Sequence, residues 1–109
     1  MTTITLNNGI RMPVLGFGTF QMGGAACTES VKAALEAGYR MIDTAEAYGN
    51  EEAVGAALAE SGVPREELFL ITKVNFRSYE NARAAVEASL NHLRTDCLDL
   101  VLLHWPFGN

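Results

Sequence analysis

Apolar and polar residues alternate along the segment 3–12 (TITLNNGIRM), on both sides of an Asn8–Gly9 pair. Such alternation is typical of a strand with one buried face, and Asn-Gly adopts the positive φ angles that a two-residue hairpin turn requires. The segment therefore predicts a small β-hairpin at the start of the chain. Pro13 is expected to end the pairing, because proline has no N–H to donate. The segment 14–20 (VLGFGTF) then predicts a short apolar strand that contains two glycines.

Three later segments carry apolar residues at the spacing of an amphipathic helix. We expect helices over residues 28–38, 50–62 and 78–93. Each begins with a side chain that can accept hydrogen bonds from the free N–H groups of a first helical turn, namely Thr28, Asn50 and Ser78. Glycines close the first two helices, as is common at helix C-termini.

Apolar segments over residues 39–44, 68–74 and 98–105 predict strands that alternate with these helices. The segment 68–74 (LFLITKV) is almost continuously apolar, which is typical of a parallel strand covered on both faces. The strand starts recur about every 25 to 30 residues, the length of a strand-helix unit with a right-handed crossover. The pattern therefore predicts an α/β chain with four parallel strands and three intervening helices. Periodicity alone leaves open whether the sheet is an open doubly wound sheet or part of a closed barrel.

The length of 109 residues suits one domain but is well short of the roughly 250 residues of a complete eight-stranded barrel. Hydrophobic residues make up 49% of the chain and charged residues 19%, so the chain can bury a core. The net charge of -5, with both signs interspersed, argues against nucleic acid or an anionic membrane as a partner. We expect a cytoplasmic protein, because the sequence has neither the pattern of a secretion signal nor an apolar run of about 18 residues.

The two cysteines, Cys27 and Cys97, stand 70 positions apart and match no metal-binding or redox spacing. We expect both to be small apolar packing residues and predict no metal site.

Polar residues stand at the carboxyl ends of three predicted strands. These residues are Asp43, Lys73 and His104, and Tyr48 follows in the loop after the first of these strands. The carboxyl ends of parallel strands meet at one edge of the sheet, where α/β proteins build their sites. Strand alternation places the three strand-end residues on one face, although the pattern does not say which face. The sequence therefore predicts a site at this edge.

The chemistry of these four residue types suits the reduction of a carbonyl group. A phenol of ordinary pKa, about 10, is a poor proton donor near neutral pH, but an adjacent ammonium group stabilises the phenolate. Lys73 can supply that cation to Tyr48, and Asp43 can hold the lysine in place. A neutral imidazole N–H of His104 can orient a carbonyl oxygen. The set has no nucleophile, so we expect a hydride from a nicotinamide cofactor.

Each of these residues also has an ordinary structural interpretation. An isolated aspartate after a strand is commonly a loop cap, a tyrosine a pocket wall, a lysine a solvated strand tip, and a histidine a core residue. Their occurrence together at successive strand ends favours the catalytic interpretation. His92 is expected on the surface of the third helix, and Asp99, at the opposite end of its strand from the site, is expected to serve stability. The GFG run (16–18) is too short for a dinucleotide-binding fingerprint, which excludes a Rossmann fold.

Four runs resemble the aldo-keto reductase family in their order and spacing, and bacterial members of the diketogluconate-reductase type most of all. They are GFGTF (16–20), GYRMIDTAEAYGNEEAVGAAL (38–58), LFLITKV (68–74) and LRTDCLDLVLLHWP (93–106). The resemblance implies a (β/α)8 TIM barrel, of which residues 1–109 form a single N-terminal half-barrel portion, and NADPH-dependent reduction of aldehydes and ketones to alcohols.

The resemblance also implies roles for individual residues. The catalytic tetrad is Asp43, Tyr48, Lys73 and His104. The nicotinamide end of NADPH or NADP lies against Gly18, Thr19, Phe20 and Asp43. The walls of the substrate pocket are Phe20, Tyr48, His104 and Trp105.

The chain departs from the family pattern in three respects. Phe20 stands where many members have tryptophan, and Asn75 stands near a place often held by an aromatic residue, so the substrate does not follow from the resemblance. The third departure is the absence of strands five to eight, which in the family supply most cofactor contacts. We therefore expect little or no turnover by these residues alone.

Three explanations of the half barrel stay open at this point. They are a part of a full-length reductase, a half barrel that pairs with a copy of itself, and a non-catalytic remnant that retains the tetrad. In each case open strand edges and an uncovered apolar face favour association. The expected partners are a small carbonyl substrate and a second half barrel.

Overall fold

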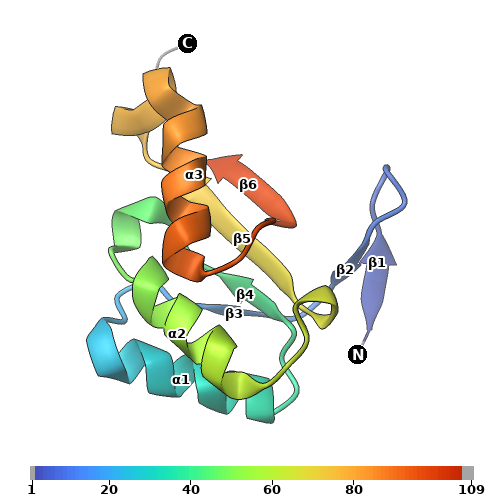
Figure 1. Cartoon of the computed structure of the whole chain (residues 1–109). Helices are drawn as coiled ribbons and strands as arrows, with labels where there is room; N and C mark the ends of the chain where they lie inside the picture. The colour runs from blue at the N-terminus through green and yellow to red at the C-terminus, as the bar shows by residue number, and fades with distance from the viewer. Residues whose placement is uncertain (1, 107–109) are drawn as a thin grey trace.

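The computed structural model describes residues 2–106 and contains a hairpin and a four-stranded parallel sheet (Figure 1). The hairpin pairs β1 (Thr3–Thr5) with β2 (Arg11–Pro13) in antiparallel fashion. The parallel sheet has the order β3-β4-β5-β6, and its strands are β3 (Gly16–Gly18), β4 (Met41–Asp43), β5 (Phe69–Val74) and β6 (Leu100–Leu103). The prediction of a leading hairpin and four parallel strands is confirmed.

Three α-helices connect the parallel strands, and Figure 1 shows them together on one side of the sheet, away from the hairpin. They are α1 (Gly24–Glu36), α2 (Glu51–Ser61) and α3 (Ala82–Leu93). Short 3-10 helices η1 (Glu46–Tyr48), η2 (Arg65–Glu67) and η3 (Phe76–Asn81) lie in the connections. Helix α2 contacts both α1 and α3. Among the described residues, none of the helices is both long and apolar enough to cross a membrane.

The hairpin turn differs from the predicted two-residue turn. Leu6 N–H donates to the main-chain oxygen of Ile10, which leaves three residues in the loop. Gly9 N–H donates to Leu6 O, and Gly9 has φ +86°. This is a type I turn followed by one left-handed residue, the common three-residue hairpin loop. The Asn-Gly signal placed the turn correctly, but the glycine closes a longer loop.

The predicted N-caps of the helices are wrong in detail. Helix α1 begins at Gly24, one turn before Thr28, and the Thr28 hydroxyl donates instead to Ala53 O at 3.0 Å, which joins α1 to α2. Asn50 precedes α2, but its side chain makes no cap bond there. Ser78 lies within η3, and α3 begins only at Ala82. These polar side chains are used for contacts between elements, which sequence-local capping rules do not consider.

The hydrophobic core lies between the sheet and the helices. Ile42 of β4 and Leu70 of β5 are 0% and 2% exposed and pack in one cluster with apolar side chains of all three helices. The remaining members of the cluster are Cys27, Val31, Leu35, Val54, Ala57, Leu68 and Leu93. Since successive side chains of a strand point to opposite faces, the neighbours of Ile42 and Leu70 face the side without helices.

Within the parallel sheet, the expected exposure of large apolar side chains occurs on β6. Val101, Leu102 and Leu103 are 38%, 40% and 64% exposed, and they include residues of both faces of the strand. On the side without helices, however, Phe69 and Ile71 of β5 are only 4% and 6% exposed. These two side chains of β5 are therefore buried by their neighbours. Within residues 2–106, no strand pairs with the outer edges of β3 and β6.

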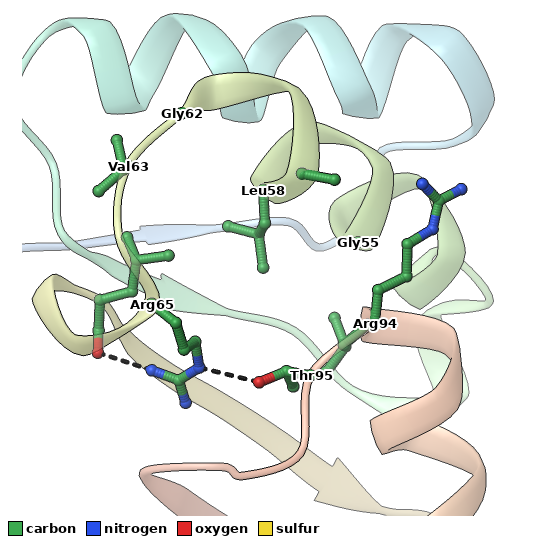
Figure 2. Close-up of a pocket in the computed structure, with 10 residues that line it drawn as sticks. Gly55, Leu58, Gly62, Val63, Arg65, Arg94 and Thr95 are labelled. Atoms are coloured by element: carbon green, nitrogen blue, oxygen red, sulfur yellow. Dashed lines mark hydrogen bonds between the residues drawn. The ribbon is translucent and has the colours of Figure 1, made fainter.

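An ion pair stabilises the amino-terminal end of the sheet, as predicted for Asp99. Arg65 Nη2 lies 2.7 Å from Asp99 Oδ2, and the same oxygen accepts a bond from Leu70 N–H. Arg65 also donates to Thr95 Oγ1 and to Leu68 O, as Figure 2 shows. These residues lie beside a cavity of about 310 Å³ between α2 and the end of α3. Each nitrogen of the guanidinium donates to at least one such structural contact, so we assign no ligand to this cavity.

The two cysteines have different surroundings. Cys27 is buried in the core, as predicted, whereas Cys97 is exposed, so the prediction of a packing role is wrong for Cys97. Burial raises the pKa of the Cys27 thiol above its ordinary value of 9.0. The folded state therefore keeps this proton where the unfolded chain loses it, and the contribution of Cys27 to stability falls as the pH rises above 9.0.

We expect iodoacetamide to alkylate Cys97 in the native protein at least about 100 times faster than Cys27, because only an accessible thiolate reacts. Mass spectrometry of peptides from a time course measures both rates. Urea should make the two rates similar, and Cys97→Ser should remove the fast reaction. Equal rates in the native protein would contradict the burial of Cys27.

Candidate active site

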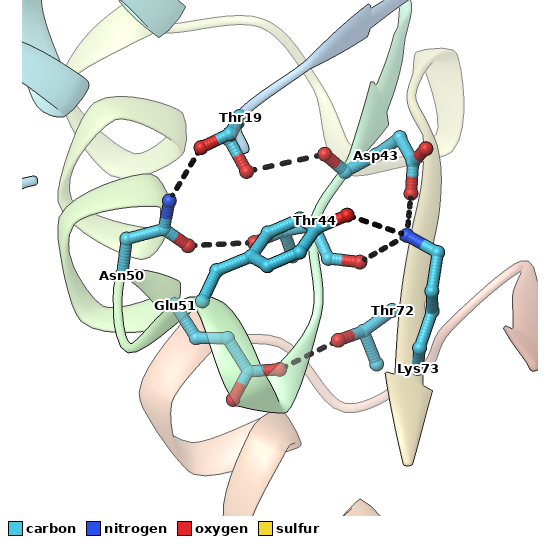
Figure 3. A network of polar contacts seen from close by, with 8 residues as sticks. Thr19, Asp43, Thr44, Asn50, Glu51, Thr72 and Lys73 are labelled. Atoms are coloured by element: carbon cyan, nitrogen blue, oxygen red, sulfur yellow. Dashed lines mark hydrogen bonds and ion pairs between the residues drawn. The ribbon is translucent and has the colours of Figure 1, made fainter. Parts of the chain in front are cut away.

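The ammonium group of Lys73 lies at the centre of the site (Figure 3). Its Nζ donates a 2.6 Å bond to Asp43 Oδ1 and a 3.0 Å bond to the main-chain oxygen of Thr44. The phenolic oxygen of Tyr48 lies 3.4 Å from the same nitrogen. The Lys73 side chain is 13% exposed and that of Asp43 is 39% exposed. The ion pair is therefore partly shielded from water, which strengthens a charge-assisted hydrogen bond, while its carboxylate still reaches the surface.

Sheet register explains why these residues meet. Asp43 pairs with Ile71, and Lys73 lies two residues beyond Ile71 on the same face of β5. This face is the one without helices, because Ile42 and Leu70 occupy the other. The structure thus identifies the face that strand alternation left open. Tyr48 reaches the same place as the last residue of η1, a turn that contacts β5.

His104 follows the last residue of β6, and its main-chain N–H donates to the main-chain oxygen of Val74 at 3.0 Å. Its ring lies edge-on to Tyr48, with centroids 5.8 Å apart, and stacks on Trp105 at 5.4 Å. Its Nδ1 is buried and has no hydrogen-bond partner among the described residues. Because an unpaired buried N–H is rarer than an unpaired acceptor, we assign the proton of a neutral His104 to Nε2.

Aromatic side chains surround an opening beside the phenol of Tyr48. The cavity has a volume of about 400 Å³ and is lined by Phe20, Ala47, Tyr48, His104 and Trp105. Phe20 and Trp105 are 64% and 52% exposed, so the opening is walled by apolar surface. A cavity of this size and character suits a small organic molecule. The structure brings all four predicted substrate-pocket residues together.

The residues predicted to contact a nicotinamide lie at different depths. A Cβ atom at Gly18 would meet no atom within 4 Å, so the surface beside Gly18 is open. Phe20 is exposed at the edge of the cavity. Thr19 is 0% exposed, and its hydroxyl donates to Asp43 O at 3.2 Å. The Thr19 side chain is therefore buried, and it ties the chain that leaves β3 to the end of β4.

Sequence reasoning missed a buried polar network behind the site, shown in Figure 3. Asn50 is 2% exposed; its Oδ1 accepts from Thr44 Oγ1, and its Nδ2 donates to Thr19 O and Met22 O. These bonds join the end of β4 to the loop after β3. The only sequence signal was a polar residue before a helix, which capping rules explain equally well.

A second buried contact lies next to this network. Glu51 is 5% exposed, and its Oε2 accepts a 2.7 Å bond from Thr72 Oγ1 of β5. The first turn of α2 is thereby fixed to the strand that carries Lys73. Among residues 2–106, no group of three or more His, Cys, Asp or Glu side chains could hold a metal ion.

Comparison with known proteins places this arrangement in a family. The model of the aldo/keto reductase family matches residues 14–109. Glyoxal reductase of Bacillus subtilis is 53% identical over 107 residues, which cover 95% of this chain and 39% of that protein. A crystal structure of an aldo/keto reductase from Brucella melitensis superposes with a TM-score of 0.95 at 44% identity and covers 99% of this chain and 42% of that one. The crystal structure of a proposed 2,5-diketo-D-gluconic acid reductase B superposes with a TM-score of 0.92 at 47% identity. This match covers 100% of this chain and 40% of that one.

The chain spans about 39% of the length of the curated relatives that it matches. The predicted fold, part of a (β/α)8 barrel, is confirmed by the close superposition on these solved structures. With the family model matched over most of the chain, the protein belongs to the aldo/keto reductase family.

Proposed function

We propose that residues 1–109 form the N-terminal half barrel of an NADPH-dependent reductase of aldehydes and ketones. One observation supports this proposal above all. The phenol of Tyr48, the ammonium of Lys73 and the carboxylate of Asp43 form a chain of close contacts, with distances of 3.4 Å and 2.6 Å, beside an aromatic cavity. A proton donor next to a cation and a small-molecule opening suits the protonation of a carbonyl oxygen during reduction.

The residues of this chain have distinct roles in the proposed reaction. Asp43 holds Lys73 in place and balances its charge. Lys73 stabilises the negative charge that remains on Tyr48 as the phenolic proton passes to the substrate oxygen. His104 donates from Nε2 to the same oxygen and so orients the carbonyl group. The carbonyl carbon gains a hydride and the oxygen gains a proton, which gives an alcohol.

The hydride is the chemistry that NADPH supplies when bound. The residues fit a nicotinamide ring, because the surface at Gly18 is open and the side chains of Asp43 and Phe20 are exposed enough to contact a ligand. Gly18, Phe20 and Asp43 would hold the nicotinamide end, with the buried Thr19 supporting them. NADPH as the cofactor rests on the sequence resemblance, and a cytoplasmic location rests on the sequence pattern.

We propose small carbonyl compounds as the substrates. The exposed rings of Phe20 and Trp105 give the cavity largely apolar walls, and Tyr48 and His104 add a phenol and an imidazole to its lining. The names of two relatives, glyoxal reductase and 2,5-diketo-D-gluconic acid reductase, specify compounds with two carbonyl groups. Glyoxal is therefore a suitable first substrate for an assay.

A second half barrel completes the site in this proposal. The outer edges of β3 and β6 and the exposed side chain of Leu102, which shares the face of Lys73, match the surfaces that a further four strands would cover. We expect the 109-residue chain by itself to turn over little or no substrate, because one half barrel encloses the cavity on one side only. The same exposed edges also support an alternative, in which two copies of this chain pair without catalysis. A dimer in light scattering combined with absent NADPH binding would favour that alternative.

The proposal is tested with a completed barrel, which we define as this chain followed by the segment of Bacillus subtilis glyoxal reductase that lies beyond its matched 107 residues. We expect a glyoxal-dependent fall in NADPH absorbance at about 340 nm, the absorption band of the reduced nicotinamide. The 109-residue chain without the added segment is the control. A folded completed barrel that binds NADPH but reduces no aldehyde or ketone would contradict the proposed function.

A further inference from the structure

We propose that Glu46 is a positioning residue that fixes the phenol of Tyr48 relative to the ammonium of Lys73. This inference rests on the proposed function, because it concerns the geometry of the same site. Glu46 lies outside the cavity lining and is not a member of the predicted tetrad. Its carboxylate instead connects two segments that carry members of that tetrad.

The contacts of Glu46 define the connection. Its Oε1 accepts a 2.8 Å bond from Asn75 N–H, and its Oε2 accepts a 3.0 Å bond from Ser78 Oγ. Glu46 is the first residue of η1, and Tyr48 is the last. Asn75 stands two residues beyond Lys73. Both oxygens of one carboxylate thus join the turn that carries Tyr48 to the chain that leaves β5.

This connection adds to the side-chain contacts that hold the Tyr48 ring beside Phe20, Lys73 and His104. The backbone hydrogen bonds of η1 stay within the turn. Tyr48 N–H donates to Ala45 O, and Gly49 N–H donates to Glu46 O. They fix the shape of the turn but not its distance from β5. The 3.4 Å separation of the phenolic oxygen and Lys73 Nζ is already longer than a usual N–H···O hydrogen bond. A small outward movement of η1 would therefore break this contact.

The role that we assign to Glu46 is geometric rather than electrostatic. A glutamine at this position can make both contacts, since its Oε1 accepts from Asn75 N–H and its Nε2 donates to Ser78 Oγ. An alanine can make neither contact. The pair Glu46→Gln and Glu46→Ala therefore separates the connection from the negative charge.

Steady-state kinetics of the completed barrel test the inference. Misplacement of a catalytic group by about 1 Å can cost a factor of about 10² in rate. We expect Glu46→Ala to lower kcat by a factor of about 10 to 100 with KM changed less than about twofold, and Glu46→Gln to retain at least about a third of kcat. Glu52→Ala is the matched control, because its side chain is 83% exposed and lies in the neighbouring first turn of α2. This control should have unchanged kinetics.

Hydrogen exchange of the Asn75 amide gives a readout that needs no activity. We expect Glu46→Ala to speed this exchange at least about tenfold and Glu46→Gln to leave it near the wild-type rate, because only alanine removes the acceptor. An unchanged kcat in Glu46→Ala, or a Glu46→Gln variant as impaired as Glu46→Ala, would overturn the positioning role. If the completed barrel itself reduces no carbonyl, the proposed function fails, and unchanged Asn75 exchange in Glu46→Ala would then overturn this inference separately.

Discussion

Replacement of Tyr48 by phenylalanine is expected to lower kcat of the completed barrel by a factor of about 10² to 10⁴, the usual contribution of a general acid. Phenylalanine keeps the ring, whose centroid lies 5.3 Å from that of Phe20 and 5.8 Å from that of His104, so the cavity walls stay in place. The substitution removes only the hydroxyl that lies 3.4 Å from Lys73 Nζ. Without it, no proton donor of this kind faces the substrate oxygen.

The affinity for NADPH should change little in the same variant, because the phenol acts on the oxygen of the substrate. Initial rates with glyoxal and a fluorescence titration with NADPH measure the two quantities separately. Tyr39→Phe is a matched control: Tyr39 packs edge-on against Phe17 with centroids 5.8 Å apart and is not among the residues that line the cavity. A Tyr48→Phe enzyme that keeps more than about a tenth of kcat would exclude Tyr48 as the acid, given the size expected for this contribution.

Gly55→Ala is expected to destabilise the fold by about 2 kcal/mol. An added Cβ would lie 2.4 Å from the main-chain oxygen of His92 and 2.9 Å from the Cα of Leu93, so α2 and α3 would have to move apart (Figure 2). Overpacking against backbone costs about 3 kcal/mol at the upper end of its usual range. The better helix propensity of alanine offsets only about 1 kcal/mol of this cost.

Urea denaturation of the 109-residue chain, followed by circular dichroism, measures the change in the free energy of unfolding. Gly23→Ala is the matched control, because a Cβ there would meet no atom within 4 Å and the residue has φ -132°. We expect this control to stay within about 0.5 kcal/mol of the parent, as surface substitutions usually do. If Gly55→Ala changed the free energy of unfolding as little as Gly23→Ala, the close approach of α2 and α3 at Gly55 would be wrong.

Local patterns predicted the elements better than their ends. The apolar run of β5 was recovered almost to the residue, since a strand buried on both faces leaves a continuous hydrophobic signal. The start of α3 was placed four residues early at Ser78, because the Ser78 hydroxyl donates to Glu46 instead of capping a helix. The same distinction applies to Asn50. A polar side chain before a helix carries no local mark of a partner more than 20 residues away.

The sequence alone determined the order of strands and helices and placed Asp43, Lys73 and His104 at the carboxyl ends of parallel strands. It could do so because periodicity and strand polarity are local properties, and because carboxyl ends of parallel strands share one edge. Only the tertiary structure decided which face these residues use, that the Thr19 side chain is buried against the end of β4, and that Glu46 joins the Tyr48 turn to the end of β5. Those features depend on helix packing, sheet register and contacts between distant segments, and no local pattern records them.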